Sequence, residues 1–158
     1  MKILVFSDSH GMISPMAAAV RLEQPELVLH LGDHDRDVTE LKRSFPELDC
    51  RGVSGNCDPR SGREELRIDA EGVPLLLVHG HRQRVKQTLT PLYLKALEAG
   101  VRCVLFGHTH IPLLQREGDL TLLNPGSIGF GLPPSYGVLL VQSGSLECSL
   151  REARFPET

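Results

Sequence analysis

The sequence predicts an α/β protein in which a largely parallel sheet is followed by antiparallel hairpins. Short apolar runs alternate with helical patterns through the first two thirds of the 158 residues. Consecutive strand patterns separated by Gly, Pro and Ser turns fill the last third. Strands that alternate with helices form largely parallel sheets, and the later hairpins indicate a second sheet or an extension of the first. The length fits a single domain, residues 1–158.

The first half of the chain is expected to hold three strands and two helices. Ser14 is expected to cap a helix that has Pro15 in its first turn and runs to about Glu23. A short helix is expected from Asp37 to Ser44. The expected strands are 2–7, 27–31 and 49–53.

The second half begins with a predicted hairpin of strands 65–69 and 73–78, joined by a turn at Glu71-Gly72. A helix from Thr90 to about Ala99 is expected to end at Gly100. The further strands expected are 101–106, 111–117, 120–123, 136–142 and 145–151. The stretch 136–141 is expected to pair at an exposed edge.

The composition excludes several classes of protein. Seventeen basic against twenty acidic residues give a net charge of −3, which argues against a duplex nucleic-acid binder. The apolar runs are too short for a transmembrane helix, and we find no signal-peptide pattern. Cys50, Cys57, Cys103 and Cys148 form no C-x-x-C pair, so we expect free thiols in a reducing, cytoplasmic location. No membrane partner is expected.

Five of the predicted strands end in side chains that can bind metal. The ends read Asp8-Ser9-His10, Gly32-Asp33, Gly55-Asn56, His79-Gly80-His81 and Gly107-His108-Thr109-His110. Ligands bind outside the carboxyl ends of strands in open α/β sheets, so parallel neighbours would bring these ends to one rim. Such oxygen and imidazole donors suit Mn²⁺, Fe²⁺, Co²⁺, Ni²⁺ or Zn²⁺. Six or seven donors exceed the needs of one ion and predict two.

Each motif alone has an ordinary structural interpretation. Asp8 could cap a helix, and Gly32-Asp33 and Gly55-Asn56 are common turn pairs. Only their joint occurrence at five strand ends indicates a metal site. His30 lies inside a predicted strand, on the face opposite Asp33 by period-two counting, and we interpret it as a packing residue.

Taken in order, the motifs resemble those of the calcineurin-like metallophosphoesterase superfamily. The segments VSGNCD, LLVHGH, LFGHTH and LNPGSIG look like its compact bacterial and archaeal phosphodiesterase branch, which is also similar to a retromer subunit that keeps the fold as a scaffold. The resemblance extends from Lys2 to about Val141. It implies a four-layer α-β-β-α sandwich with two metal ions at one sheet edge.

The resemblance also implies a ligand set. One ion would be bound by Asp8, His10 and His110, and the other by Asn56, His79 and His108. Asp33 would bridge both ions. Catalytic roles would fall to Asp33, Asn56 and His108. The family's Asn-Pro-Gly-Ser turn matches Asn124 to Ser127 and is expected to shape the rim.

One position departs from the family pattern. Many members have a histidine after Gly-Asn that is proposed to protonate the leaving group, and this chain has Cys57 there. A thiol with a pKa of about 8.5 is a poor substitute for imidazole. We expect Cys57 to be a small buried apolar residue, His34 a solvated loop residue that could replace the acid, and His81 a residue that supports its neighbours. Good leaving groups, as in aryl or activated diesters, are therefore expected.

The resulting functional hypothesis is a dinuclear metal-dependent phosphodiesterase that acts on a small phosphoester, with a metal-bridging hydroxide as nucleophile. Mn²⁺ is the expected metal, and Fe²⁺, Ni²⁺, Co²⁺ or Zn²⁺ are alternatives. A non-catalytic binding scaffold on the same fold and a phosphomonoesterase are the competing functions. The physiological substrate and the oligomeric state stay open.

Overall fold

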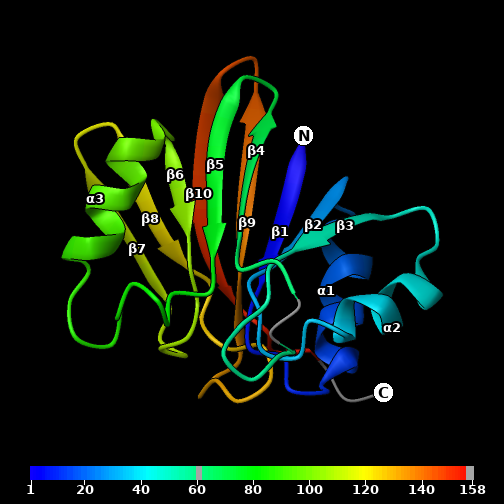
Figure 1. The fold of residues 1–158 in the computed structure, drawn as a ribbon. Helices are drawn as coiled ribbons and strands as arrows, with labels where there is room; N and C mark the ends of the chain where they lie inside the picture. The colour runs from blue at the N-terminus through cyan, green and yellow to red at the C-terminus, as the bar shows by residue number, and fades with distance from the viewer. Residues whose placement is uncertain (60–61, 156–158) are drawn as a thin grey trace.

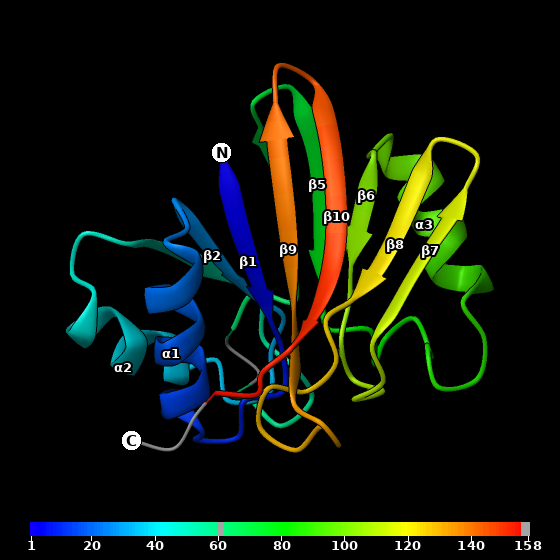
Figure 2. The same ribbon diagram turned by 180° about the vertical axis from the view of Figure 1, so that it is seen from behind.

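A computed structural model describes residues 1–59 and 62–155 and shows two five-stranded sheets packed face to face (Figure 1). The first sheet has the order β10-β9-β1-β2-β3, and the second has the order β4-β5-β6-β8-β7. Helices α1 and α2 cover the outer face of the first sheet, and α3 covers that of the second (Figure 2). The predicted four-layer α-β-β-α sandwich is therefore confirmed.

The elements follow the expected order along the chain. The strands are β1 (Lys2–Phe6), β2 (Leu27–His30), β3 (Asp49–Gly52), β4 (Glu65–Ala70), β5 (Val73–Val78), β6 (Cys103–Leu105), β7 (Leu113–Glu117), β8 (Leu120–Asn124), β9 (Ser135–Gln142) and β10 (Ser145–Glu152). The helices are α1 (Ile13–Glu23), α2 (Asp37–Ser44) and α3 (Thr90–Ala99). No helix among the described residues is long and apolar enough to cross a membrane.

The four layers follow from the alternation of side chains along continuously apolar strands. In β1, Ile3 and Val5 enter the core between the two sheets, whereas Leu4 and Phe6 pack against the helices outside. Successive side chains of a strand point to opposite faces, so a strand covered on both faces must be apolar at every position. This explains why the apolar runs in the sequence are continuous rather than alternating.

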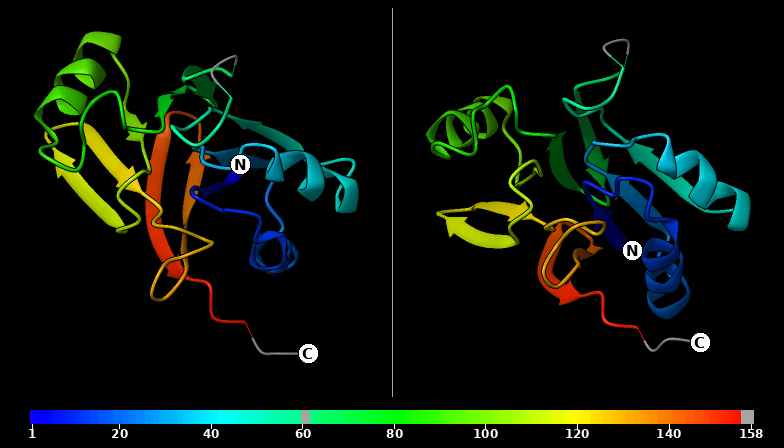
Figure 3. Two further views of the ribbon diagram at one scale, coloured as in Figure 1. Left: turned by 60° about the horizontal axis from the view of Figure 1, so that its bottom comes forward. Right: turned by 90° about the horizontal axis from the view of Figure 1, so that it is seen from below.

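Parallel strands bring their carboxyl ends to one end of the sandwich. Strands β1, β2 and β3 are parallel in the first sheet, and β5, β6 and β8 are parallel in the second. The loops that follow these strands gather at the end of the molecule that faces the viewer in the right panel of Figure 3. The single rim predicted from the sequence is therefore a junction between two sheets.

Three local predictions were wrong. Helix α1 begins at Ile13 with Met12 as its N-cap residue and has no side-chain cap, so Ser14 lies inside the helix. The C-terminal third is not wholly antiparallel, because β8 pairs in parallel with β6. Strand β9 lies between β1 and β10, so the stretch 136–141 is interior rather than at an edge.

Candidate metal centre

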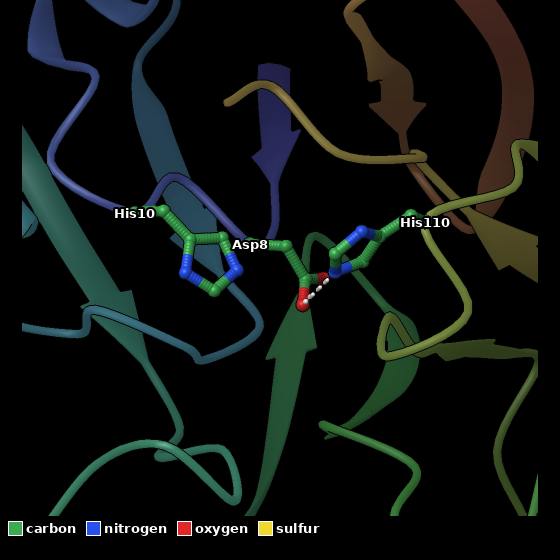
Figure 4. Close-up of side chains that lie close together, drawn as sticks. All are labelled: Asp8, His10 and His110. Carbon is green, nitrogen blue, oxygen red and sulfur yellow. Dashed lines mark hydrogen bonds and ion pairs between the residues drawn. The ribbon is translucent and has the colours of Figure 1, made fainter. Parts of the chain in front are cut away.

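The first group of donors comes from the ends of β1 and β6, which belong to different sheets. Asp8, His10 and His110 place one potential ligand atom each within 4.8 Å of one another (Figure 4). Nε2 of His110 lies 3.1 Å from Oδ1 of the buried Asp8. These are the three residues that the family resemblance assigns to one ion.

The second group consists of three buried residues, Asp8, Asp33 and His79. Nε2 of His79 lies 3.5 Å from Oδ2 of Asp33 and 3.9 Å from Oδ1 of Asp8. Nδ1 of His79 lies 2.8 Å from the Leu31 carbonyl oxygen, which can only accept its N–H. A histidine that ligates a metal commonly donates its other ring N–H to a carbonyl in this way, which directs Nε2 of His79 toward the two carboxylates.

The other two predicted ligands, His108 and Asn56, belong to neither group: His108 contacts His79, whereas Asn56 is exposed. Nδ1 of His108 lies 3.2 Å from Nε2 of His79. Burial and the charge of His79 lower the pKa of His108 to about 4, so its ring is neutral at pH 7, the state in which imidazole coordinates a cation. Asn56 is exposed, and its side-chain N–H donates to the Cys57 sulfur at 3.7 Å.

A buried nitrogen without a partner tests whether a cation fits this site. Within residues 1–59 and 62–155, Nε2 of His10 is buried and has no hydrogen-bond partner. Among the same residues, Nδ1 of His34 and Nδ1 of His81 are also buried without a hydrogen-bond partner. Buried polar atoms are nearly always paired, and a ligand is one explanation of an exception. Together with the oxygen and imidazole chemistry of both groups, the free nitrogen of His10 fits divalent cations.

Two glycines allow the strand ends to approach so closely. A Cβ at Gly55, after β3, would overlap Oδ1 of Asp33 and lie 2.9 Å from Nδ1 of His79. A Cβ at Gly107, after β6, would overlap the Ser7 hydroxyl and lie 2.8 Å from Oδ2 of Asp8. Each glycine therefore lets a strand end of one sheet contact a donor of the other.

Left-handed backbone is concentrated at this end of the molecule. Of the ten non-glycine residues with positive φ among the described residues, five belong to the motifs and a sixth directly follows one: Asp8, His10, Asp33, His108 and His110, and then His34, with φ from 47° to 71°. This conformation is unfavourable for residues with a Cβ and tends to persist at functional sites. Here it turns successive side chains toward the site.

The three residues of the second group perturb one another's ionisation. Burial raises the pKa of Asp8. Burial opposes ionisation of Asp33 as well, but the His79 ring and the Cys57 backbone N–H lower its pKa. Burial alone would lower the pKa of His79, whereas the two carboxylates raise it. The metal-free site thus holds an anionic Asp33 beside an imidazole that attracts a proton.

Sequence reasoning missed the role of Asp58. Its Oδ2 accepts the backbone N–H groups of Asp33 and Gly55, both at 2.8 Å. Its Oδ1 accepts those of His34 at 2.8 Å and Asp35 at 3.1 Å. One carboxylate therefore ties the loop after β2 to the loop after β3. An acidic residue two positions after Gly55-Asn56 was visible, but three of its four partners, Asp33, His34 and Asp35, are 23 to 25 residues away in the sequence.

His30 is confirmed as a buried residue that belongs to neither donor group. Its Nδ1 accepts the Gly32 N–H at 3.1 Å, which leaves a neutral ring with its proton on Nε2. That nitrogen lies 2.8 Å from the Ser9 hydroxyl, which donates to Asp37 at 2.6 Å. The chain of hydrogen bonds connects the loops that carry His10 and Asp33.

We expect acid to destabilise the metal-free protein partly through His30. Burial lowers the pKa of His30 from 6.5 to about 4. Above pH 6.5 the ring is neutral in both the folded and unfolded chain. Between pH 6.5 and 4 only the unfolded chain takes up the proton, so the free energy of unfolding falls, by about 3 kcal/mol in all.

His30→Asn keeps an oxygen for the Gly32 N–H but removes the titrating group. Urea unfolding of metal-free protein at several pH values gives the free energy of unfolding as a function of pH. Between pH 6.5 and 4 this free energy should fall less steeply in His30→Asn than in the wild type, by an amount that corresponds to the uptake of up to one proton fewer on unfolding. Equal slopes in the two proteins would contradict the role of His30.

Two predictions about residues near the site were wrong, those for Cys57 and His34, and the structure is consistent with a third, that for His81. Cys57 is exposed rather than buried, and its backbone N–H donates to Oδ1 of Asp33 at 2.9 Å. His34 is half-buried, with its ring centroid 5.0 Å from that of His10, so it is not a solvated loop residue. His81 lies with its ring centroid 5.5 Å from that of His79, consistent with a supporting role. All four cysteines are free thiols, as expected.

The fold and the donor cluster define a class, the metallophosphoesterase-like α/β sandwich. A model of the calcineurin-like phosphoesterase superfamily domain matches residues 1–144. The chain therefore belongs to the calcineurin-like phosphoesterase superfamily.

Two proteins similar in sequence to this chain are named as a metallophosphoesterase and a phosphodiesterase. The chain is 35% identical over 152 residues to the probable metallophosphoesterase YsnB of Bacillus subtilis (strain 168), which covers 90% of this chain and 86% of YsnB. It is 32% identical over 99 residues to the phosphodiesterase YfcE of Escherichia coli (strain K12), which covers 55% of this chain and 50% of YfcE.

Solved structures share the fold. A predicted phosphoesterase from Streptococcus pneumoniae TIGR4 superposes with a TM-score of 0.78 at 24% identity, covering 96% of this chain and 89% of that chain. Vps29 from Entamoeba histolytica in complex with Zn²⁺ gives a TM-score of 0.75 at 20% identity, covering 98% of this chain and 100% of that chain.

Proposed function

We propose that this protein hydrolyses small phosphodiesters with the aid of two divalent cations. The observation that carries the proposal is that buried Asp8 belongs to both donor groups, which lie side by side where the two sheets meet. The name of the relative YfcE supports a diester rather than a monoester substrate. We also propose that residues 1–158 act as one domain, since both sheets supply donors.

The proposed ligand set keeps the assignment that the family resemblance implies. Asp8, His10 and His110 would hold one ion, Asn56, His79 and His108 the other, and Asp33 would bridge them. Asp8, which belongs to both donor groups, would lie near the second ion as well. Such ions, when bound, supply Lewis acidity that makes water more acidic and withdraws charge from phosphoryl oxygens. Mn²⁺ is the proposed metal.

The protein's own groups would orient the substrate. Asp58 holds the Asp33 backbone, and the Leu31 carbonyl fixes the ring of His79. Asn56 is exposed, and besides the N–H that donates to the Cys57 sulfur its amide has a second N–H for a phosphoryl oxygen. Neutral His108 faces the same site. Two carboxylates against two divalent cations leave a positive surplus, which favours an anionic ester.

Cys57 supports a preference for good leaving groups. Burial and the charge of Asp33 raise the pKa of the Cys57 thiol, which makes it a weak proton donor at neutral pH. A leaving group that needs no protonation, such as a phenolate, is therefore favoured over an alkoxide. Aryl and other activated diesters are the proposed substrate class.

Elemental analysis and a paired assay test the proposal. The purified protein is expected to contain about two divalent ions per chain. Once these ions are removed, it should hydrolyse bis(4-nitrophenyl) phosphate only when Mn²⁺ is supplied. It should hydrolyse 4-nitrophenyl phosphate more slowly. Bound metal with faster monoester hydrolysis would indicate a phosphomonoesterase. Neither metal nor turnover would indicate the non-catalytic scaffold.

A further inference from the structure

Phe130 places an aromatic ring directly beside the candidate metal centre. It lies in the loop 125–134 between β8 and β9. Its ring is stacked on that of His10, with centroids 4.6 Å apart and an interplanar angle of 19°. The centroid of His110 is 6.4 Å away. Two of the three residues in the first donor group therefore adjoin this one ring.

Much of the Phe130 side chain is nevertheless in contact with solvent. Phe130 is 59% exposed, although one face of its ring lies on His10. The surface that is not on His10 is available for contact with a bound molecule. An aromatic ring that is half-covered by a site residue and otherwise open offers a flat apolar surface next to a group that binds cations.

The loop holds this ring in a defined position. The Ser127 hydroxyl donates to the Asp8 carbonyl oxygen at 2.8 Å and accepts the Phe130 N–H at 2.8 Å. A Cβ at Gly129 would overlap the Ser9 carbonyl oxygen, so the loop backbone is packed tightly on the turn that carries Asp8 and His10. Leu132 in the same loop is fully exposed and makes no comparable contact with a ring of the site, among the residues described.

We propose that Phe130 determines specificity by stacking on a planar aromatic substituent of the phosphoester substrate, either an aryl group or a nucleobase. This inference rests on the proposed function, because the phosphoryl group must be bound at the neighbouring donors. Aromatic rings stack on one another with a gain that corresponds to about two- to tenfold in affinity. Aliphatic esters of the same charge would lack this gain.

Pairs of ligands that differ only in the ring test the inference. Binding to the Mn²⁺-loaded protein is measured by titration calorimetry for phenylphosphonate against methylphosphonate, and for adenosine 5′-monophosphate against ribose 5-phosphate. The wild type is expected to prefer the aromatic member of at least one pair by about two- to tenfold. The first pair reports an aryl substituent close to phosphorus, and the second reports a nucleobase.

Phe130→Ala is expected to abolish the preference and leave the affinity for methylphosphonate unchanged. Phe130→Tyr should keep the preference, and Leu132→Ala should behave as the wild type. A preference that survives in Phe130→Ala overturns the inference. An equal weakening of both members of each pair also overturns it, because Phe130 would then only position His10.

Diester hydrolysis on the same samples separates this inference from the proposed function. Mn²⁺-dependent hydrolysis with an unchanged ring preference in Phe130→Ala would reject the role of Phe130 alone. A wild-type protein that neither binds the phosphonates nor hydrolyses the diester would reject both.

Discussion

Asp33→Asn is expected to abolish Mn²⁺-dependent diester hydrolysis and to lower the bound metal. The substitution keeps the shape of the side chain but removes the charge that lies 3.5 Å from His79. Loss of residues that merely support metal ligands costs about 10–100-fold, so loss of a bridging carboxylate should exceed about 100-fold in activity. Elemental analysis and the rate with bis(4-nitrophenyl) phosphate measure the two effects.

Asp69→Asn is the matched control, because Asp69 is an exposed carboxylate that accepts the Gly72 N–H, away from the donor groups. It should leave metal content and rate unchanged. Full activity of Asp33→Asn would refute the bridging role. Asp8→Asn adds a comparison, since Asp8 is the carboxylate common to both donor groups.

Asp58→Ala is expected to lower the free energy of unfolding by about 2–4 kcal/mol, because four backbone N–H groups lose a charged acceptor that water replaces only in part. The loops after β2 and β3 would also separate, which should weaken Mn²⁺ binding by about 10–100-fold. Urea unfolding of metal-free protein and Mn²⁺ titration measure these effects.

Asp58→Asn keeps one acceptor oxygen. Its free energy of unfolding and its affinity for Mn²⁺ should therefore lie between those of the wild type and those of Asp58→Ala. Asp49→Ala removes an exposed carboxylate that pairs with Arg51 and serves as the control, with an expected change within about 0.5 kcal/mol. If Asp58→Ala matched Asp49→Ala in both measurements, Asp58 would have no part in holding the site.

Much of the fold could be predicted because it depends on local patterns. Helices α2 and α3 begin and end where the sequence indicated, and Gly100 ends α3 in the left-handed conformation. The division into two sheets could not be read from periodicity, since a strand covered on both faces looks the same in one sheet or two. The interior place of β9 likewise depends on a pairing with β1 across more than 130 residues.

The donors could be predicted for a similar reason. Residues at the carboxyl ends of parallel strands must gather, so Asp8, Asp33 and His79 were visible as candidates. Asp58 and Phe130 act through contacts with distant loops, which no short motif encodes. The residue type of Cys57 favours burial, but the side chain is exposed in its loop.

The left-handed backbone at six residues in or next to the motifs has a consequence for the thermal stability of this chain. Each such residue costs about 1 kcal/mol or more, and domains are stable by only about 5–15 kcal/mol in total. Ligands that bind only the folded state raise its stability in proportion to the logarithm of their concentration. If the site binds cations as proposed, the melting temperature of this protein would rise and fall with the supply of divalent metal in its surroundings.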